Sequence, residues 1–303
     1  MQMHSKSINL SPGRYITVLL LLLLSGRGTA CYGEKMQGEL SRTKNFVCYY
    51  GSGNEDLLSQ FDIVILEPEN YSETDIGKIK TRGARVFGYL SLGEDSELRR
   101  TKGDSGKNYS GYYMDADKDG MPDKNGNWGS YYVNAGNPEW VEFVSNKARE
   151  ILMKGCNGLF LDTLDTVDLY PSTRNGMVKL IKHLDSKFSS AFIIANRGIT
   201  ILDEIAPVID GEMIESFTST YDWDTKSYRK LNNEEIRWVN RLAEKIVHSQ
   251  KDTGFIVLIL DYTQKNDFET MGYCRERAEQ FGFLCSFSDI NLSQIYQTRK
   301  RVQ

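Results

Sequence analysis

The sequence predicts an α/β fold of the closed (β/α)8, or TIM barrel, type, in a single domain with an insertion after the third strand. Short apolar runs rich in β-branched and aromatic residues alternate with amphipathic helical patterns. The runs are too apolar for a sheet with one wet face, which indicates a parallel sheet covered by helices. Eight such units between residues 45 and 290 match the ~250 residues typical of this barrel.

The apolar runs are the eight predicted strands. They lie at Phe46–Tyr50, Ile63–Leu66, Arg85–Leu92, Gly158–Leu161, Phe192–Ala195, Ile209–Ile214, Phe255–Leu260 and Phe283–Phe287. A doubly wound open sheet is the main alternative, because "YGSGNED" after the first run supplies half of a dinucleotide-binding fingerprint. The third glycine position holds Asp56, so we interpret this segment as a turn.

Two of the helices between these strands carry clear start and stop signals. Asn137 is placed to cap a helix with Pro138 in its first turn, and Gly155 is placed to end it. A second helix is expected over residues 236–247, where apolar residues recur at helical spacing after the acidic Glu234.

Residues 1–30 have the composition of a secretory signal peptide. They carry three cations and no acid, and their apolar run from Ile16 to Leu24 is far shorter than the ~20 residues of a spanning helix. Small residues at Gly28 and Ala30 suit cleavage before Cys31, which would then accept a bacterial lipid anchor. A lipobox normally has leucine where Gly28 stands, so simple secretion is the alternative.

The mature protein is therefore expected outside the cytoplasm. If Cys31 is lipidated, the protein lies in the periplasm, at the outer membrane or at the cell surface, and residues 31–44 form a linker to the barrel domain at 45–303. Loss of the leader changes the net charge from -4 to -7, because three cations leave with it. This acidity argues against nucleic acid or anionic lipid as a partner and leaves the Cys31 anchor as the only expected membrane contact.

Cysteine and histidine chemistry is not indicated. Four cysteines follow Cys31 without a CxxC pair or a histidine spacing of zinc type, so buried free thiols are expected. Cys48 and Cys285 would face each other only if the first and last strands are neighbours. The histidines of the mature chain, His183 and His248, lie in helical stretches, which argues against a histidine base or a Ser-His-Asp triad.

Polar or acidic side chains end nearly every predicted strand. In a barrel, the active site lies at these carboxyl ends. Several carboxylates over one barrel mouth, without a phosphate loop or a cysteine nucleophile, suit glycoside hydrolysis, which needs one acid and one carboxylate across the bond. The strand ends, in order, are Tyr50, Glu67, Glu94, Asp162, Asn196, Glu215, Asp261, and Ser286 with Ser288.

Five short motifs occur in order at these strand ends: "GYLSLGE", "GCNGLFLDTLD", "IANRG", "GEMIES" and "VLILDY". Over residues 45–290 the chain thus resembles glycoside hydrolase family 114, the endo-α-1,4-polygalactosaminidase group. The resemblance implies a (β/α)8 barrel that cleaves α-1,4-linked galactosamine chains, with Asp162 as nucleophile and Glu215 as general acid and base of a retaining mechanism. The departures, Cys156 and Asn157 before the strand and "NRG" in place of a plainer Asn-Gly turn, concern substrate identity more than reaction type.

The residues themselves point to the same pair. Asp162 and Glu215 end the fourth and sixth strands, so inward side chains from these alternate strands fall in one layer over the barrel axis. Their separation, ~5 Å in a retaining enzyme or ~6.5 to 9.5 Å in an inverting one, is left open. The apolar neighbours of Glu215 suggest a raised pKa, whereas Asp162 is expected to stay ionised.

Further side chains are expected to hydrogen-bond or stack on the substrate: Tyr50, Glu94, Asp165, Asn196, Asp261, Tyr262, Tyr221 and Trp223. For Asp165 the alternative is a helix N-cap, and for Asp168 the cap is the preferred interpretation. Trp128 and the tyrosines around it offer further aromatic faces, for sugar stacking or for packing within the loop.

The insertion, about residues 100–136, contains "DADKDGMPD". Asp115, Asp117, Asp119 and Asp123 occupy positions one, three, five and nine of a calcium loop. Position twelve is Gly126 instead of the bidentate glutamate, so a structural calcium ion and a solvated acidic loop are both open. The hydrolysis itself requires no cofactor.

Three functions remain from the sequence alone. The first is an exported or lipid-anchored glycosidase that cleaves an α-linked polymer of galactosamine or N-acetylgalactosamine. The second is a glycan-binding surface lipoprotein that has lost turnover, and the third is a different barrel glycosidase, such as an α-galactosidase. Retention of both acids favours an enzyme, because a binder needs no acid opposite a carboxylate.

Overall fold

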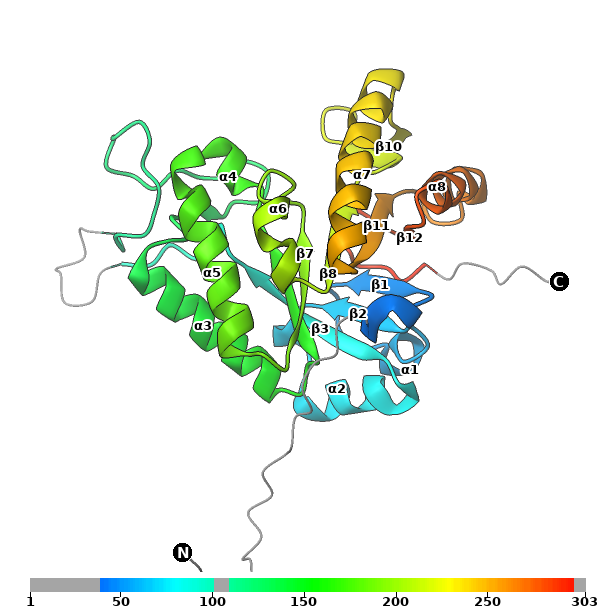
Figure 1. Cartoon of the computed structure of the whole chain (residues 1–303), viewed down its shortest axis with the longest axis horizontal. Coiled ribbons are helices and arrows are strands. Elements are labelled where there is room, and N and C mark those ends of the chain that lie inside the picture. Colours follow the sequence, from blue (N-terminus) through cyan, green and yellow to red (C-terminus); the bar gives the residue numbers. More distant parts are fainter. Residues whose placement is uncertain (1–38, 101–108, 297–303) are drawn as a thin grey trace, which may run out of the picture. The chain divides into compact units, whose positions relative to one another are not determined.

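The computed structural model describes residues 39–100 and 109–296 (Figure 1). The expected signal peptide, the lipidation site at Cys31 and most of the linker lie outside the described residues. Within the described residues, no helix has both the length and the apolarity required to cross a membrane.

Eight parallel strands form one sheet, in the order β1-β2-β3-β6-β7-β8-β11-β12. At its two ends, β12 lies beside β1, and the Tyr50 amide donates to the Leu292 carbonyl at 2.8 Å, which brings the two edges together. The predicted (β/α)8 barrel is confirmed. The strands are β1 (Phe46–Tyr49), β2 (Ile63–Leu66), β3 (Arg85–Ser91), β6 (Gly158–Asp162), β7 (Phe192–Asn196), β8 (Gly211–Glu215), β11 (Ile256–Tyr262) and β12 (Leu284–Ser288).

Helices cover the outside of the sheet, with α3 and α5 on one side of the strands and α7 and α8 on the other (Figure 1). Strand residues alternate between two apolar clusters, because successive side chains point to opposite faces. The outer cluster includes the apolar faces of the helices. The inner cluster fills the barrel and includes Phe46, Cys48, Ile63, Ile65, Phe87, Phe160, Ile194, Met213, Leu258 and Leu260.

The two predicted helices begin as expected. The Asn137 side chain accepts from the Glu139 amide at the start of α3, and Asn232 and Glu235 form a capping box at the start of α7. Gly155, at φ 96°, follows the end of α3. The α-helices are α1 (Glu55–Leu58), α2 (Glu73–Ile79), α3 (Pro138–Met153), α4 (Thr166–Leu169), α5 (Arg174–Lys187), α6 (Leu202–Ile205), α7 (Asn233–Thr253) and α8 (Phe268–Gln280), and short 3-10 turns lie at Glu39–Arg42, Pro68–Asn70, Lys80–Arg82, Pro171–Thr173 and Ala206–Val208.

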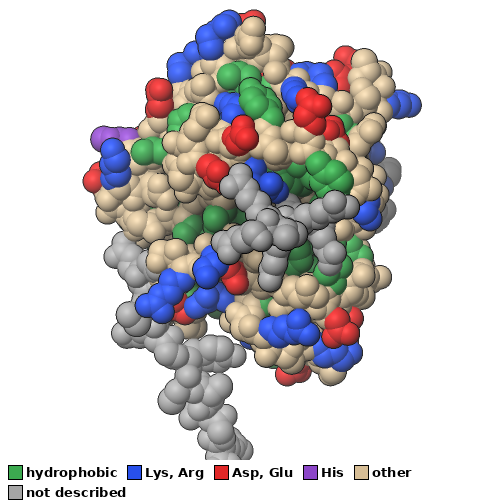
Figure 2. Space-filling model, turned by 90° about the vertical axis from the view of Figure 1, so that its right-hand side faces the viewer, with side chains coloured by type: hydrophobic (Ala, Val, Ile, Leu, Met, Phe, Trp, Pro, Cys, Tyr) green, Lys and Arg blue, Asp and Glu red, His purple; other side chains and the backbone are tan. Residues whose placement is uncertain are grey.

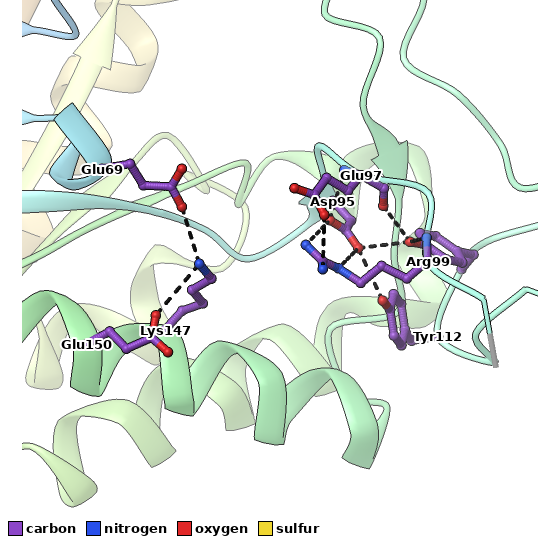
Figure 3. A network of polar contacts seen from close by, with 8 residues as sticks. Glu69, Asp95, Glu97, Arg99, Tyr112, Lys147 and Glu150 are labelled. Atoms are coloured by element: carbon purple, nitrogen blue, oxygen red, sulfur yellow. Dashed lines mark hydrogen bonds and ion pairs between the residues drawn. The ribbon is translucent and has the colours of Figure 1, made fainter. Parts of the chain in front are cut away.

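The insertion after β3 is tied down at its base by Asp95. Strand β4 (Glu94–Asp95) pairs antiparallel with β5 (Tyr131–Tyr132). The buried Asp95 carboxylate accepts from the Tyr112 and Tyr113 hydroxyls at 3.2 and 2.8 Å and pairs with Arg99 at 3.0 Å (Figure 3). Three side chains from the insertion thus converge on one carboxylate, which holds the start of the insertion against the barrel rim.

A second insertion into the barrel, which the sequence analysis did not predict, follows β8. It is an antiparallel hairpin of β9 (Ser219–Asp222) and β10 (Ser227–Lys230). Arg229 braces it through ion pairs to Asp222 at 3.1 Å and to Glu235 of α7 at 2.8 Å. On the face drawn in Figure 2, lysine and arginine side chains are interspersed with aspartate and glutamate, as expected for a solvated outer surface.

The tight approach of β6 to β7 yields a stability prediction. A Cβ atom at Gly158 would lie 2.3 Å from the Phe192 carbonyl oxygen, which the backbone cannot accommodate in place. We expect Gly158→Ala to lower the free energy of unfolding by about 2–3 kcal/mol. Gly272→Ala, in α8 with no atom within 4 Å of the new Cβ, is the control and should raise it by about 0.5–1 kcal/mol. Similar effects of both variants in thermal or urea unfolding would contradict this packing.

Candidate active site

Three polar side chains meet inside one end of the barrel. Asp162, Asn196 and Glu215 are the last residues of β6, β7 and β8, and each continues the inward alternation of the residue two positions before it. The Asn196 amide nitrogen donates to Asp162 Oδ1 at 2.7 Å and to Glu215 Oε1 at 2.6 Å. These two carboxylate oxygens are therefore at most about 5.3 Å apart, the sum of the two distances.

Tyrosine side chains complete the immediate surroundings of the two acids. The Tyr262 hydroxyl donates to Glu215 Oε2, and the Tyr89 hydroxyl interacts with Asp162. The rings of Tyr89 and Tyr50 meet edge to face at 5.3 Å between centroids. The structure thus brings four sequence-predicted residues, Asp162, Asn196, Glu215 and Tyr262, into direct contact, and it places Tyr50 beside them.

The backbone is left-handed directly after each of the three polar residues. Thr163, Arg197 and Ser216 have φ angles of 62°, 61° and 57°, a region that non-glycine residues rarely adopt. Such conformations persist only where the surroundings hold them, and they concentrate at functional sites. The Thr163 hydroxyl, for example, accepts from the Gly93 amide at 2.7 Å. Three adjacent strands that end in this way indicate that the loops fix the directions of the two acids.

Burial and the charge of Glu215 raise the pKa of Asp162 to about 6, against the lowering effect of the hydrogen bond from Asn196. The sequence analysis expected the raised pKa on Glu215 and an ionised Asp162. The expectation for Asp162 is wrong, because this carboxylate is fully enclosed and faces a second acid, which raises its pKa. A negative charge on Glu215 therefore disfavours the ionised form of Asp162.

Arg197 is a site residue that the sequence analysis missed. Its guanidinium Nη1 lies 3.1 Å from Asp165 Oδ2. Burial lowers the pKa of Arg197, but the charges of Glu215 and Asp165 outweigh burial and raise it. The sequence signal was the "NRG" motif, in which a cation directly follows Asn196. Arg197 therefore places a permanent positive charge beside the acid pair.

The two further aspartates after β6 have distinct partners, and neither caps a helix. Asp165 is the residue before α4, but its side chain makes no cap hydrogen bond and instead pairs with Arg197. Asp168 accepts from the Thr200 hydroxyl at 2.8 Å, so the expected cap at Asp168 is wrong. Both acids tie the loop after β6 to the loop after β7, and Asp165 is half-exposed.

Asp261 does not lie in the barrel mouth. It alternates with the inward Leu260 and Tyr262, so it points outward to the helix layer, where it is fully buried. Its Oδ1 accepts from the Thr218 and Ser219 amides at 2.7 and 3.0 Å. The expected substrate contact through Asp261 is thus corrected to a structural role, in which this carboxylate holds the start of the β9–β10 hairpin.

The carboxylate of Glu94 also accepts structural hydrogen bonds. It is buried at the base of the insertion, and its two carboxylate oxygens accept from the Asn125 amide at 3.0 Å and from the Ser130 hydroxyl. Both donors lie in the turn that carries Trp128. These bonds engage both oxygens in holding the insertion, and the substrate contact through Glu94 stays a prediction.

The structure brings three of the four calcium-loop candidates together. Carboxylate oxygens of Asp115, Asp117 and Asp123 lie within 4.8 Å of one another. Asp119 is not part of this group, and one of its oxygens accepts from the Met121 amide at 2.7 Å. Oxygen ligands of this kind suit calcium, and calcium binding by the loop stays a prediction.

Comparisons with known proteins give a family match and several structures of the same fold. A family model described as "Glycoside-hydrolase family GH114" matches residues 30–303. The uncharacterized protein MJ1477 of Methanocaldococcus jannaschii is 25% identical over 256 residues, which are 73% of this chain and 68% of that protein.

Among solved structures, the glycoside hydrolase domain of PelA from Pseudomonas aeruginosa is 23% identical, with a TM-score of 0.68 over 83% of this chain and 97% of that one. Ega3 of Aspergillus fumigatus, solved in complex with galactosamine, has a TM-score of 0.61 at 14% identity and covers 89% of this chain and 98% of its own. The α-galactosidase TtGalA of Thermus thermophilus has a TM-score of 0.52 at 18% identity over 84% of this chain and 59% of that one. At these identities, the likeness shows the shared barrel fold.

The bridging amide predicts how Asp162 titrates. In NMR of carboxyl-labelled protein, Asp162 should titrate with a midpoint near 6. Asn196→Ala removes a hydrogen bond that favours the ionised form, so the midpoint should rise by about one pH unit. The exposed Asn146→Ala serves as control and should leave the midpoint unchanged. A midpoint that stays or falls in Asn196→Ala would contradict the bridge.

Calcium is expected to stabilise the insertion loop. Saturating calcium should raise the thermal midpoint of unfolding by several degrees, because it binds only the folded loop, and a chelator should reverse the rise. Asp117→Asn should abolish the effect, whereas Asp252→Asn on the exposed face of α7 should keep it. An equal response of both variants, or none in the unsubstituted protein, would mean that the loop is simply solvated.

Proposed function

The chain belongs to glycoside hydrolase family GH114, and we propose that it cleaves an α-linked amino-sugar polymer of galactosamine or N-acetylgalactosamine type by a retaining mechanism. One observation supports the mechanism: Asp162 and Glu215 share the Asn196 amide, and the two bonded oxygens lie at most about 5.3 Å apart. Retaining glycosidases hold their carboxyl groups ~5–5.5 Å apart, whereas inverting enzymes need ~6.5–9.5 Å to admit a water molecule.

In this mechanism Asp162 attacks the anomeric carbon while Glu215 donates a proton to the leaving glycosidic oxygen. Glu215 then removes a proton from the water that releases the sugar from Asp162. Asn196 orients both carboxylates, and the Tyr262 hydroxyl holds the second oxygen of Glu215. Because Asp162 must be ionised to attack and its pKa is about 6, activity should fall as the pH drops below that value.

Two features support an amino sugar as the substrate. The Ega3 structure, with the same barrel, was solved with galactosamine. In addition, Asp165 stands half-exposed beside the acid pair, where its carboxylate can accept from an amine or a hydroxyl. Arg197 neutralises part of that charge, so the balance between free amine and N-acetyl groups depends on this ion pair.

We also propose that the mature protein is exported and anchored through a lipid on Cys31. The cationic, acid-free leader with its short apolar run supports this location. Detergent phase partitioning of the cell-made protein tests it: the unsubstituted protein should enter the detergent phase and Cys31→Ser should not. Equal partitioning of both into the aqueous phase would leave simple secretion.

The proposed function predicts the following outcome. Residues 31–303, incubated with oligomers of α-1,4-linked galactosamine, N-acetylgalactosamine or both, should yield shortened oligomers in mass spectrometry. Asp162→Asn and Glu215→Gln should each lower the rate by roughly 10³-fold or more. Asp168→Asn, on the same loop as Asp162 but bonded to Thr200, should retain activity.

Other outcomes separate the alternatives. Intact oligomers that nevertheless bind the folded protein would support the glycan-binding lipoprotein and contradict turnover. Cleavage of p-nitrophenyl α-D-galactopyranoside, without any action on the amino-sugar oligomers, would support an α-galactosidase. Activity that survives in both acid variants would remove Asp162 and Glu215 from the mechanism.

A further inference from the structure

Two exposed tryptophans from different excursions touch each other at the barrel rim. Trp128 belongs to the insertion after β3 and is 60% exposed, and Trp223 belongs to the β9–β10 hairpin and is 46% exposed. Their rings meet edge to face at 5.5 Å between centroids. Strands β6 and β7, which carry Asp162 and Asn196, stand between β3 and β8 in the sheet. The contact therefore joins loops from opposite sides of the catalytic strands.

The tryptophan pair belongs to a row of aromatic rings that leads towards the barrel interior. Trp223 meets Tyr221 at 5.1 Å, and Tyr221 meets Tyr228 at 5.2 Å. Tyr228 packs against the apolar cluster that fills the barrel, and its hydroxyl accepts from the Ile290 amide at 3.1 Å. Four aromatic side chains thus lead from the barrel interior to the outer edge of the insertion.

Each of the two tryptophans stands on a segment that a buried carboxylate holds in place. Glu94 binds Asn125 and Ser130 on either side of Trp128. Asp261 holds the Thr218 and Ser219 amides at the start of the hairpin that carries Trp223. A large apolar side chain that is exposed and yet rigidly placed is typical of a binding surface, because little entropy is lost when a ligand covers it.

We propose that Trp128 and Trp223 form a distal sugar subsite that binds a linear glycan several residues away from the bond being cleaved. The occupant is the polymer chain itself, because the row of rings is continuous with the barrel that holds the acid pair. Aromatic faces suit the apolar faces of sugar rings, and exposed indole N–H groups suit their hydroxyls. Glu94 and Asp261 act as positioning residues for this subsite.

The proposal rests on the proposed function for the identity of the glycan, and it predicts a dependence on chain length. We expect a disaccharide bound at the acid pair to end before the tryptophans and an octasaccharide to reach them. Removal of either indole should weaken octasaccharide binding by roughly 5- to 30-fold and leave disaccharide binding unchanged. Trp238, on α7 and 55% exposed, provides a matched control outside the row.

Binding is measured calorimetrically in an Asp162→Asn background, so that the galactosamine oligomers are not consumed. Trp128→Ala and Trp223→Ala should each lose octasaccharide affinity, Trp128→Tyr should keep most of it, and Trp238→Ala should match the parent. Far-ultraviolet circular dichroism checks that each variant is folded. Unchanged octasaccharide affinity in folded Trp128→Ala, or an equal loss in Trp238→Ala, would overturn the subsite.

Hydrolysis by the protein with Asp162 intact separates this proposal from the proposed function. Cleavage that does not depend on Trp128 at any chain length would refute the subsite and leave the enzyme in place. Length-dependent binding through Trp128 without any cleavage would refute the proposed function and leave the subsite. A parent protein that binds no octasaccharide would refute both.

Discussion

The Asn196 amide, shared between two buried carboxylates, is the interaction on which the site depends. At a separation of at most about 5.3 Å and an effective dielectric constant of ~20, two full negative charges would repel by at least about 3 kcal/mol. Burial first and this repulsion second raise the pKa of Asp162 from 3.8 to about 6. The hydrogen bond from the Asn196 amide opposes this rise in pKa, because it favours the ionised carboxylate. The barrel thus keeps a strained acid pair that a glycosidase can use.

The rest of the structure holds that pair and secures the loops around it. Left-handed residues after Asp162, Asn196 and Glu215 fix the directions of the loops at the rim. Buried carboxylates anchor the insertion after β3 and the β9–β10 hairpin. Asp95 and Glu94 secure the insertion, and Asp261 secures the hairpin. Acids at the ends of strands therefore have two roles in this molecule, the proposed chemistry inside the barrel and the anchoring of loops outside it.

The strands and the acid pair were predictable from the sequence because both follow from local patterns. Apolar runs mark the strands, and inward alternation from Phe160 to Asp162 places a carboxylate over the axis. The same parity argument would have placed Asp261 outside, since it alternates with Leu260 and Tyr262, but the sequence analysis did not apply it there. The partners of Glu94 lie more than thirty residues away, and the direction of the pKa shifts depends on enclosure, so neither was readable from the chain alone.

The most direct test of the account is the anomeric configuration of the first product. Proton NMR during the cleavage of an α-linked galactosamine oligomer resolves the new reducing end before it equilibrates. An acid pair this close predicts the α anomer first, because two displacements at the same carbon retain configuration. Initial release of the β anomer would mean a single displacement by water, and it would contradict a site built on two carboxylates that share one amide.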